Sequence, residues 1–196
     1  MKTKKYKEKY TKEPKKQDKK KNKKPNTKWL LTITTISFLI SFCLSAISEL
    51  IIPNTFIGIS IFLVLIFILI GVIFDIIGLA VATADEKIFH SMATKKVKGA
   101  KKAINLINQK DKVASFLNDV IGDICGVISG SCGLAISIKL APIIGINKVL
   151  TTIIITSIIS ALTIGGKAFG KTIAINKCNE IVFEFSKLLS IFSKNK

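Results

Sequence analysis

Four long runs of apolar residues follow one another along the chain, and each is near or above the roughly 20 residues that a helix needs to cross a bilayer. The runs cover residues 29–52, 56–84, 113–138 and 143–166. Between the second and third runs, and after the fourth, apolar residues recur at helical spacing among lysines, which is typical of amphipathic helices. The pattern predicts an all-α integral membrane protein of about four transmembrane helices, with cytoplasmic amphipathic helices at 85–112 and 167–196.

Charge is confined to blocks outside these runs, and this orients them. Apolar residues make up 49% of the chain, and all 30 basic residues are lysines. Fourteen lysines precede Trp29, eight lie between Asp85 and Lys112, and six follow Gly166. The positive-inside rule therefore places both termini and the central basic segment in the cytoplasm. The abundance of Lys, Ile and Asn indicates an AT-rich bacterial genome, so we expect a multi-pass protein of the bacterial inner membrane.

The first 28 residues have the composition of a disordered lysine-rich tail. We expect this tail and the basic helix to contact anionic lipid headgroups, for which each nearby lysine is worth about 1 kcal/mol. A nucleic-acid partner is not expected, because the tail offers only Tyr6 and Tyr10 for stacking and no arginine. The lipid-facing lysines of the basic helix are predicted to be Lys95, Lys96, Lys98, Lys101 and Lys102.

Three aspartates, Asp75, Asp119 and Asp123, lie within the apolar runs. An ionisable residue in a transmembrane helix costs at least about 2.5 to 3.5 kcal/mol, so it usually faces a partner, a water-filled cavity or an ion path. No lysine lies in the second run or in the first half of the third, so these carboxylates must be protonated or bind a cation. Oxygen ligands suit Mg²⁺, and Asn118 or a serine of the first run could complete such a site. Protons or sodium could use the same groups.

Glycines recur on helix faces beside these carboxylates. Small residues at every fourth position allow two helix backbones to approach closely, and tight packing is their simplest interpretation. We expect the second and third runs to meet along these faces, and a homodimer could form through them or through the C-terminal helix. The predicted packing glycines are Gly71, Gly78, Gly122, Gly126 and Gly130.

Nothing in the sequence favours an enzyme. The four cysteines have no two-residue spacing of a zinc or redox site, and we interpret them as packing residues. His90 has no second His or Cys three or four residues away, so metal ligation by it is not expected. We therefore expect no catalytic residues and no covalent cofactor, and only Mg²⁺ as a transported or bound ion.

Residues 78–180 resemble the transmembrane domain of the CorB, CorC and cyclin M magnesium and cobalt transporters. The basic helix, with its Ala100-Lys101-Lys102-Ala103 core, matches best, and Gly122-Asp123 stands where the family has a Gly-Asn pair. The resemblance implies divalent cation transport. It departs from the family at two acidic positions, which fall here on Gly78 and Lys167, and Asp75 or Asp123 could restore the lost charge from shifted positions. The nucleotide-sensing domain pair that usually follows in the family is not expected after Lys196.

Two functions remain open from the sequence. The first is transport or binding of a magnesium-like divalent cation through the intramembrane carboxylates. The second is a membrane interaction or scaffold protein that keeps the family architecture without transport. The two differ in whether Asp75, Asp119 and Asp123 converge on one polar cavity.

Overall fold

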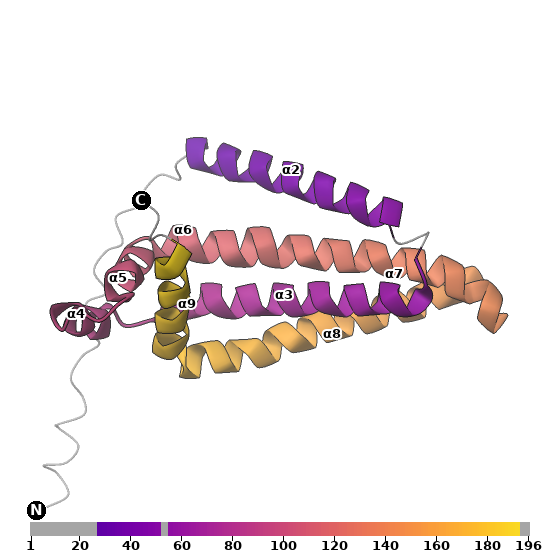
Figure 1. The fold of residues 1–196 in the computed structure, drawn as a ribbon. Helices are drawn as coiled ribbons and strands as arrows, with labels where there is room; N and C mark the ends of the chain where they lie inside the picture. The colour runs from indigo at the N-terminus through magenta and orange to yellow at the C-terminus, as the bar shows by residue number, and fades with distance from the viewer. Residues whose placement is uncertain (1–26, 52–54, 193–196) are drawn as a thin grey trace, which may run out of the picture. The chain divides into compact units, whose positions relative to one another are not determined.

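The computed structural model describes residues 27–51 and 55–192, which form helices and no strands (Figure 1). The lysine-rich tail predicted for residues 1–28 lies outside the described residues, apart from its last two positions. The chain divides into two compact units, Met1–Thr32 and Ile33–Lys196. Of the first unit the structure describes only the start of helix α2, where the Thr32 hydroxyl donates to the Lys28 carbonyl at 2.8 Å.

Four helices are long and apolar enough to cross a membrane, as the pattern predicts. They are α2 (Thr27–Ile51), α3 (Ile57–Thr83), a continuous helix of α6 (Lys110–Ser115), η2 (Phe116–Gly122) and α7 (Asp123–Ile144), and α8 (Lys148–Asn176). The short helices α4 (Glu86–Thr94) and α5 (Ala100–Asn108) follow α3, and α9 (Cys178–Phe192) follows α8. The all-α class and the number of candidate spans are therefore confirmed.

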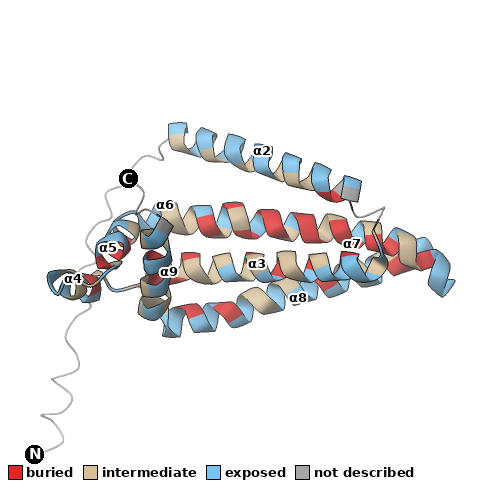
Figure 2. Ribbon diagram, viewed as in Figure 1, coloured by how far each residue is buried: buried red, intermediate tan, exposed pale blue. Residues whose placement is uncertain are grey.

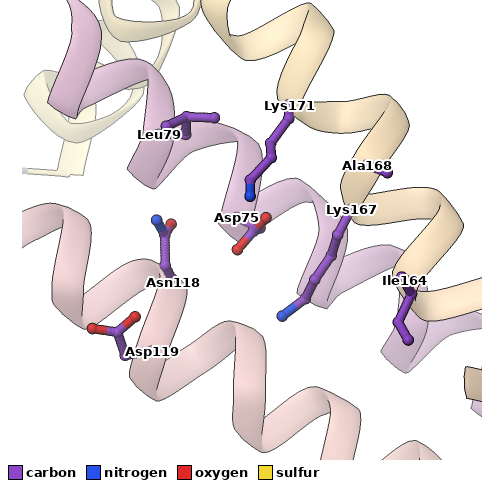
Figure 3. Close-up of a pocket in the computed structure, with 8 residues that line it drawn as sticks. All are labelled: Asp75, Leu79, Asn118, Asp119, Ile164, Lys167, Ala168 and Lys171. Atoms are coloured by element: carbon purple, nitrogen blue, oxygen red, sulfur yellow. The ribbon is translucent and has the colours of Figure 1, made fainter.

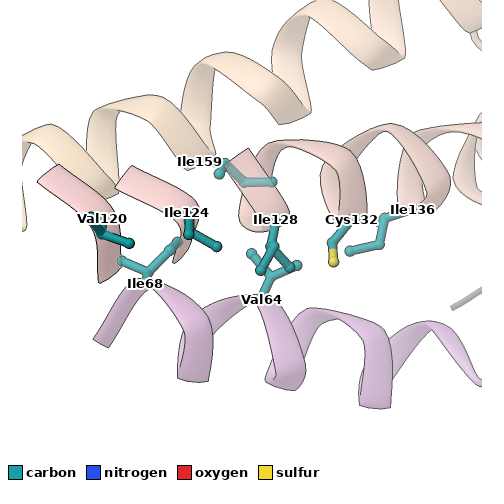
Figure 4. Close-up of a cluster of buried hydrophobic side chains, with 8 residues drawn as sticks. All are labelled: Val64, Ile68, Val120, Ile124, Ile128, Cys132, Ile136 and Ile159. Carbon is teal, nitrogen blue, oxygen red and sulfur yellow. The ribbon is translucent and has the colours of Figure 1, made fainter. Parts of the chain in front are cut away.

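Helices α3, α7 and α8 form the centre of the second unit, where each contacts the other two. Buried positions run along most of α7 (Figure 2). A first apolar cluster joins the three helices, with Ile128 fully buried at its middle (Figure 4). The contact between the three helices is thus made by closely packed aliphatic side chains. The cluster consists of Val64, Ile68, Val120, Ile124, Ile128, Cys132, Ile136 and Ile159.

The third and fourth spans differ from the predicted boundaries. Helix α7 continues through Pro142 to Ile144 and ends at Gly145, whose φ of 73° is a left-handed conformation that favours glycine. Helix α8 then begins at Lys148 and is capped by Asn147, whose side chain accepts a hydrogen bond from the Val149 amide at 2.9 Å. The predicted fourth span, 143–166, therefore begins too early. It also ends one residue before Lys167, whereas the helix continues to Asn176.

The amphipathic segments pack on one another. The apolar faces of α4, α5 and α9 form a second cluster with the end of α3 and with α8. Phe89, Ala103 and Val182 are fully buried there. The lysines at positions 95, 96, 98, 101 and 102 remain exposed, as expected of a surface that meets headgroups or water.

Two local features hold this end together. The Asp85 side chain caps α4 by accepting from the Lys87 amide at 3.0 Å, and the Asp85 amide donates to Asn179 Oδ1 of the α9 segment at 3.0 Å. Gly99 directly precedes α5 with a φ of 91°, and a Cβ there would lie 3.3 Å from the backbone of Lys187. The capping and the glycine turn thus fold the basic segment back onto α9.

Candidate cation-binding pocket

A polar pocket of about 460 Å³ lies between α3, η2 and α8, within the helices long enough to span a membrane. Asp75 reaches it from α3, Asn118 and Asp119 from η2, and Lys167 and Lys171 from α8 (Figure 3). Leu79, Ile164 and Ala168 complete its wall. Five of the eight lining residues are polar or charged, which is unusual for a site between transmembrane helices and marks it as a candidate functional site.

The π-helical segment η2 sets the positions of Asn118 and Asp119. A π-helix closes its turns with i→i+5 hydrogen bonds, and such turns in α-helices often occur at functional sites. Asp119 is further fixed by the Ser115 hydroxyl, which donates to Asp119 Oδ2 at 2.6 Å. This leaves the second carboxylate oxygen of an exposed Asp119 available at the edge of the pocket.

Close approach of α3 and η2 depends on glycine. At Gly78, an added Cβ would lie 1.9 Å from Asn118 Oδ1, so any side chain here would force Asn118 or its helix to shift. At Gly71, an added Cβ would lie 3.0 Å from Cys125 Cβ and 3.4 Å from the Gly122 carbonyl oxygen. The buried Asn118 Oδ1 has no hydrogen-bond partner among the described residues. A buried oxygen of this kind costs free energy unless a ligand, ion or water meets it.

Asp123 forms an ion pair with Lys167, at 3.1 Å between Nζ and Oδ1. The sequence suggested that no lysine was placed to neutralise this carboxylate, and for Asp123 that expectation is wrong. The reason is the length of α8, which carries Lys167 past the predicted end of the span and back against the third helix. The lysine side chain is 24% exposed and the aspartate 68%, so the pair lies at the rim with its lysine turned inward.

The four predicted metal ligands are thus divided. Asp75, Asn118 and Asp119 line one pocket, whereas Asp123 lies beside it and pairs with Lys167. In the part of the chain that the structure describes, no group of three or more His, Cys, Asp or Glu residues is placed to hold a metal ion. The pocket therefore offers two carboxylates and one amide oxygen, with two lysines close by.

The sequence interpretation missed Lys167 and Lys171 as pocket residues. Their spacing of four places both on one face of a helix, and that signal was available. The predicted apolar run ends at Gly166, so the sequence pattern places both lysines in the cytoplasmic segment that follows it. Two lysines near the end of a span can extend along the helix toward polar groups, so charge alone does not end a transmembrane helix.

The predicted packing glycines also divide. Gly71, Gly78 and Gly122 are buried in the contact between α3 and the third helix. Gly126 and Gly130 have nothing within 4 Å of an added Cβ and so do not pack there. A step of four residues turns about 40° too far for one face of an α-helix, so the stripe drifts away from the contact. Gly133, which the stripe did not include, faces Ile159 of α8, whose Cδ1 would lie 2.4 Å from an added Cβ.

Comparison with known protein families, curated proteins and solved structures found no match to this chain. The resemblance to the CorB, CorC and cyclin M transporters therefore stays a prediction from the sequence. Functional inference depends on the residues of the pocket themselves.

Proposed function

We propose that this chain is a multi-pass membrane protein that binds a magnesium-like divalent cation in the pocket between α3, η2 and α8, and moves it across the membrane. The observation that carries the proposal is the convergence of Asp75 and Asp119, from two different helices, on one pocket that also receives Asn118. Carboxylate and amide oxygens are the ligands that hard divalent cations prefer, and Mg²⁺ retains several waters. A pocket of about 460 Å³ has room for those waters.

The proposed orientation follows from the lysines. The exposed lysines of α4 and α5 lie at the same end of the second unit as the last turns of α3, in which Asp75 lies about two turns from Thr83. By the positive-inside rule this end faces the cytoplasm of a bacterial inner membrane, with both termini on that side. A cation would then reach the pocket from the cytoplasmic end along a short path.

Flux of Mg²⁺ into liposomes that contain the purified protein and a trapped magnesium-sensitive dye tests this proposal. We expect Asp75→Asn and Asp119→Asn each to reduce the flux at least about tenfold, because each removes a charged oxygen ligand. Asp111→Asn is the matched control, since it removes the same charge from α6 outside the pocket. Flux that is unchanged in both pocket variants would refute the proposal.

A second candidate function is a membrane interaction protein without transport. The Lys167–Asp123 ion pair favours it, because lysines that neutralise carboxylates also suit a purely structural polar contact. In that case folded wild-type protein would show no Mg²⁺ flux and no Mg²⁺ binding. The exposed lysines of α4 and α5 would then hold lipid headgroups or a cytoplasmic partner.

A further inference from the structure

The Lys167 side chain crosses from α8 to the third helix over a glycine surface. A Cβ on Gly122 would lie 3.6 Å from Lys167 Nζ, an ordinary van der Waals contact, so the ammonium group lies close beside this glycine. The ammonium group pairs with Asp123, and the same side chain lines the pocket that contains Asp75 (Figure 3). Lys167 therefore lies between Asp75, which is partly buried, and Asp123, which is exposed.

The charges of the pocket explain why this position matters. Two carboxylates, Asp75 and Asp119, balance one divalent cation. Any lysine ammonium that stays in the pocket repels that cation, and the repulsion is strong because charges between transmembrane helices are poorly screened. Lys171 is exposed and one turn nearer the end of α8, so it can extend toward solvent. Lys167 is the more buried of the two and pairs with Asp123.

We propose that Asp123 holds the Lys167 ammonium at the rim of this pocket, and so keeps Asp75 and Asp119 available for a free divalent cation. This inference rests on the proposed cation binding and adds its regulation. Asp123 is 68% exposed and pairs with Lys167 at 3.1 Å. The affinity of the pocket for the free cation thus depends on how well Asp123 keeps the lysine away from Asp75 and Asp119.

The proposal gives two substitutions opposite effects. Lys167→Met keeps the length and the apolar stem of the side chain and removes its charge, so Mg²⁺ should bind at least about tenfold more tightly. Asp123→Asn removes the partner that holds the ammonium at the rim, so the ammonium can approach Asp75 and Mg²⁺ should bind several-fold more weakly. The double variant Lys167→Met, Asp123→Asn should bind as tightly as Lys167→Met, because no ammonium remains at this position for Asp123 to hold.

Isothermal titration of the purified chain in lipid nanodiscs with MgCl₂ measures these affinities. Lys177→Met, at the exposed end of α8, is the matched control and should leave the affinity unchanged. If Lys167 and Asp123 form only a structural ion pair, both single variants would weaken binding, and that result would overturn the proposal. The double variant carries no unpaired charge at these positions, so weak binding by it would also count against the proposal.

Failure of this inference can be distinguished from failure of the proposed function. If wild type and Asp75→Asn give the same titration, the pocket does not bind Mg²⁺ and both fail. If Asp75→Asn abolishes the binding heat and Lys167→Met does not tighten binding, the pocket binds the cation without competition from Lys167. Only the inference about Lys167 and Asp123 is then refuted.

Discussion

The contact between Gly78 and Asn118 allows a quantitative test of how the pocket is built. In a Gly78→Ala variant the new methyl group would lie 1.9 Å from Asn118 Oδ1, 2.8 Å from Asn118 Cγ and 3.1 Å from Leu117 Cβ. Contacts below 3.0 Å cannot persist, so the asparagine or the helix that carries it must move. Insertion of a methyl group into a packed contact typically costs about 1 to 3 kcal/mol.

An opposing term is the helix propensity of alanine, which exceeds that of glycine by about 1 kcal/mol in a helix interior. Gly126→Ala measures this term alone, because nothing lies within 4 Å of a Cβ at that position. We therefore expect Gly126→Ala to be as stable as wild type or more stable by up to about 1 kcal/mol. Gly78→Ala should be less stable than Gly126→Ala by about 1 to 3 kcal/mol, the size of the steric cost.

Reversible unfolding in mixed detergent and SDS micelles, followed by circular dichroism, measures the difference in unfolding free energy. The double variant Gly78→Ala, Asn118→Ala removes the side chain that the new methyl group meets, so it should recover most of the loss relative to Asn118→Ala. Equal stability of Gly78→Ala and Gly126→Ala would refute the close contact. It would also remove the basis for an Asn118 oxygen held without a partner at the pocket.

Two further predictions concern the end of the second unit that contains α4, α5 and α9. Asp85→Ala removes the side chain that accepts from the Lys87 amide, so the unfolding free energy should fall by about 1 kcal/mol. The control Asp111→Ala, an exposed change in α6, should alter it by less than about 0.5 kcal/mol. Equal effects of the two variants in the same unfolding assay would contradict the capping role. Trypsin should cut at the exposed lysines between α4 and α5 in inside-out vesicles and not in intact spheroplasts, and mass spectrometry of the fragments would show the reverse if the orientation is wrong.

The four long apolar helices could be predicted from the sequence because their signal is local. A run of apolar residues such as 56–84 needs no knowledge of its neighbours, and α3 occupies nearly that range. The carboxylates were equally visible, and Asp75 and Asp119 do line a common pocket. The free-energy cost of an aspartate in a transmembrane helix can be judged from that helix alone, so such residues stand out in the sequence.

Partners across the fold could not be judged in this way. The ion pair of Lys167 with Asp123 joins residues 44 positions apart, and no periodicity in either segment indicates it. The amphipathic segments gave a correct helical pattern, but their apolar faces are compatible with lipid or with one another. In the structure α5 packs against α9, so these apolar faces contact each other.

The π-helical turn at residues 116–122 has a consequence for the evolutionary record of this chain. An i→i+5 turn holds one residue more than the α-helical turn it replaces. A related sequence whose third span is α-helical throughout would therefore have one residue fewer between Ser115 and Asp123, while the positions from Ile124 to Ile136 would keep the same face toward α3 and α8. Alignment of such a relative requires a gap in the middle of a transmembrane helix, at the turn that carries Asn118 and Asp119.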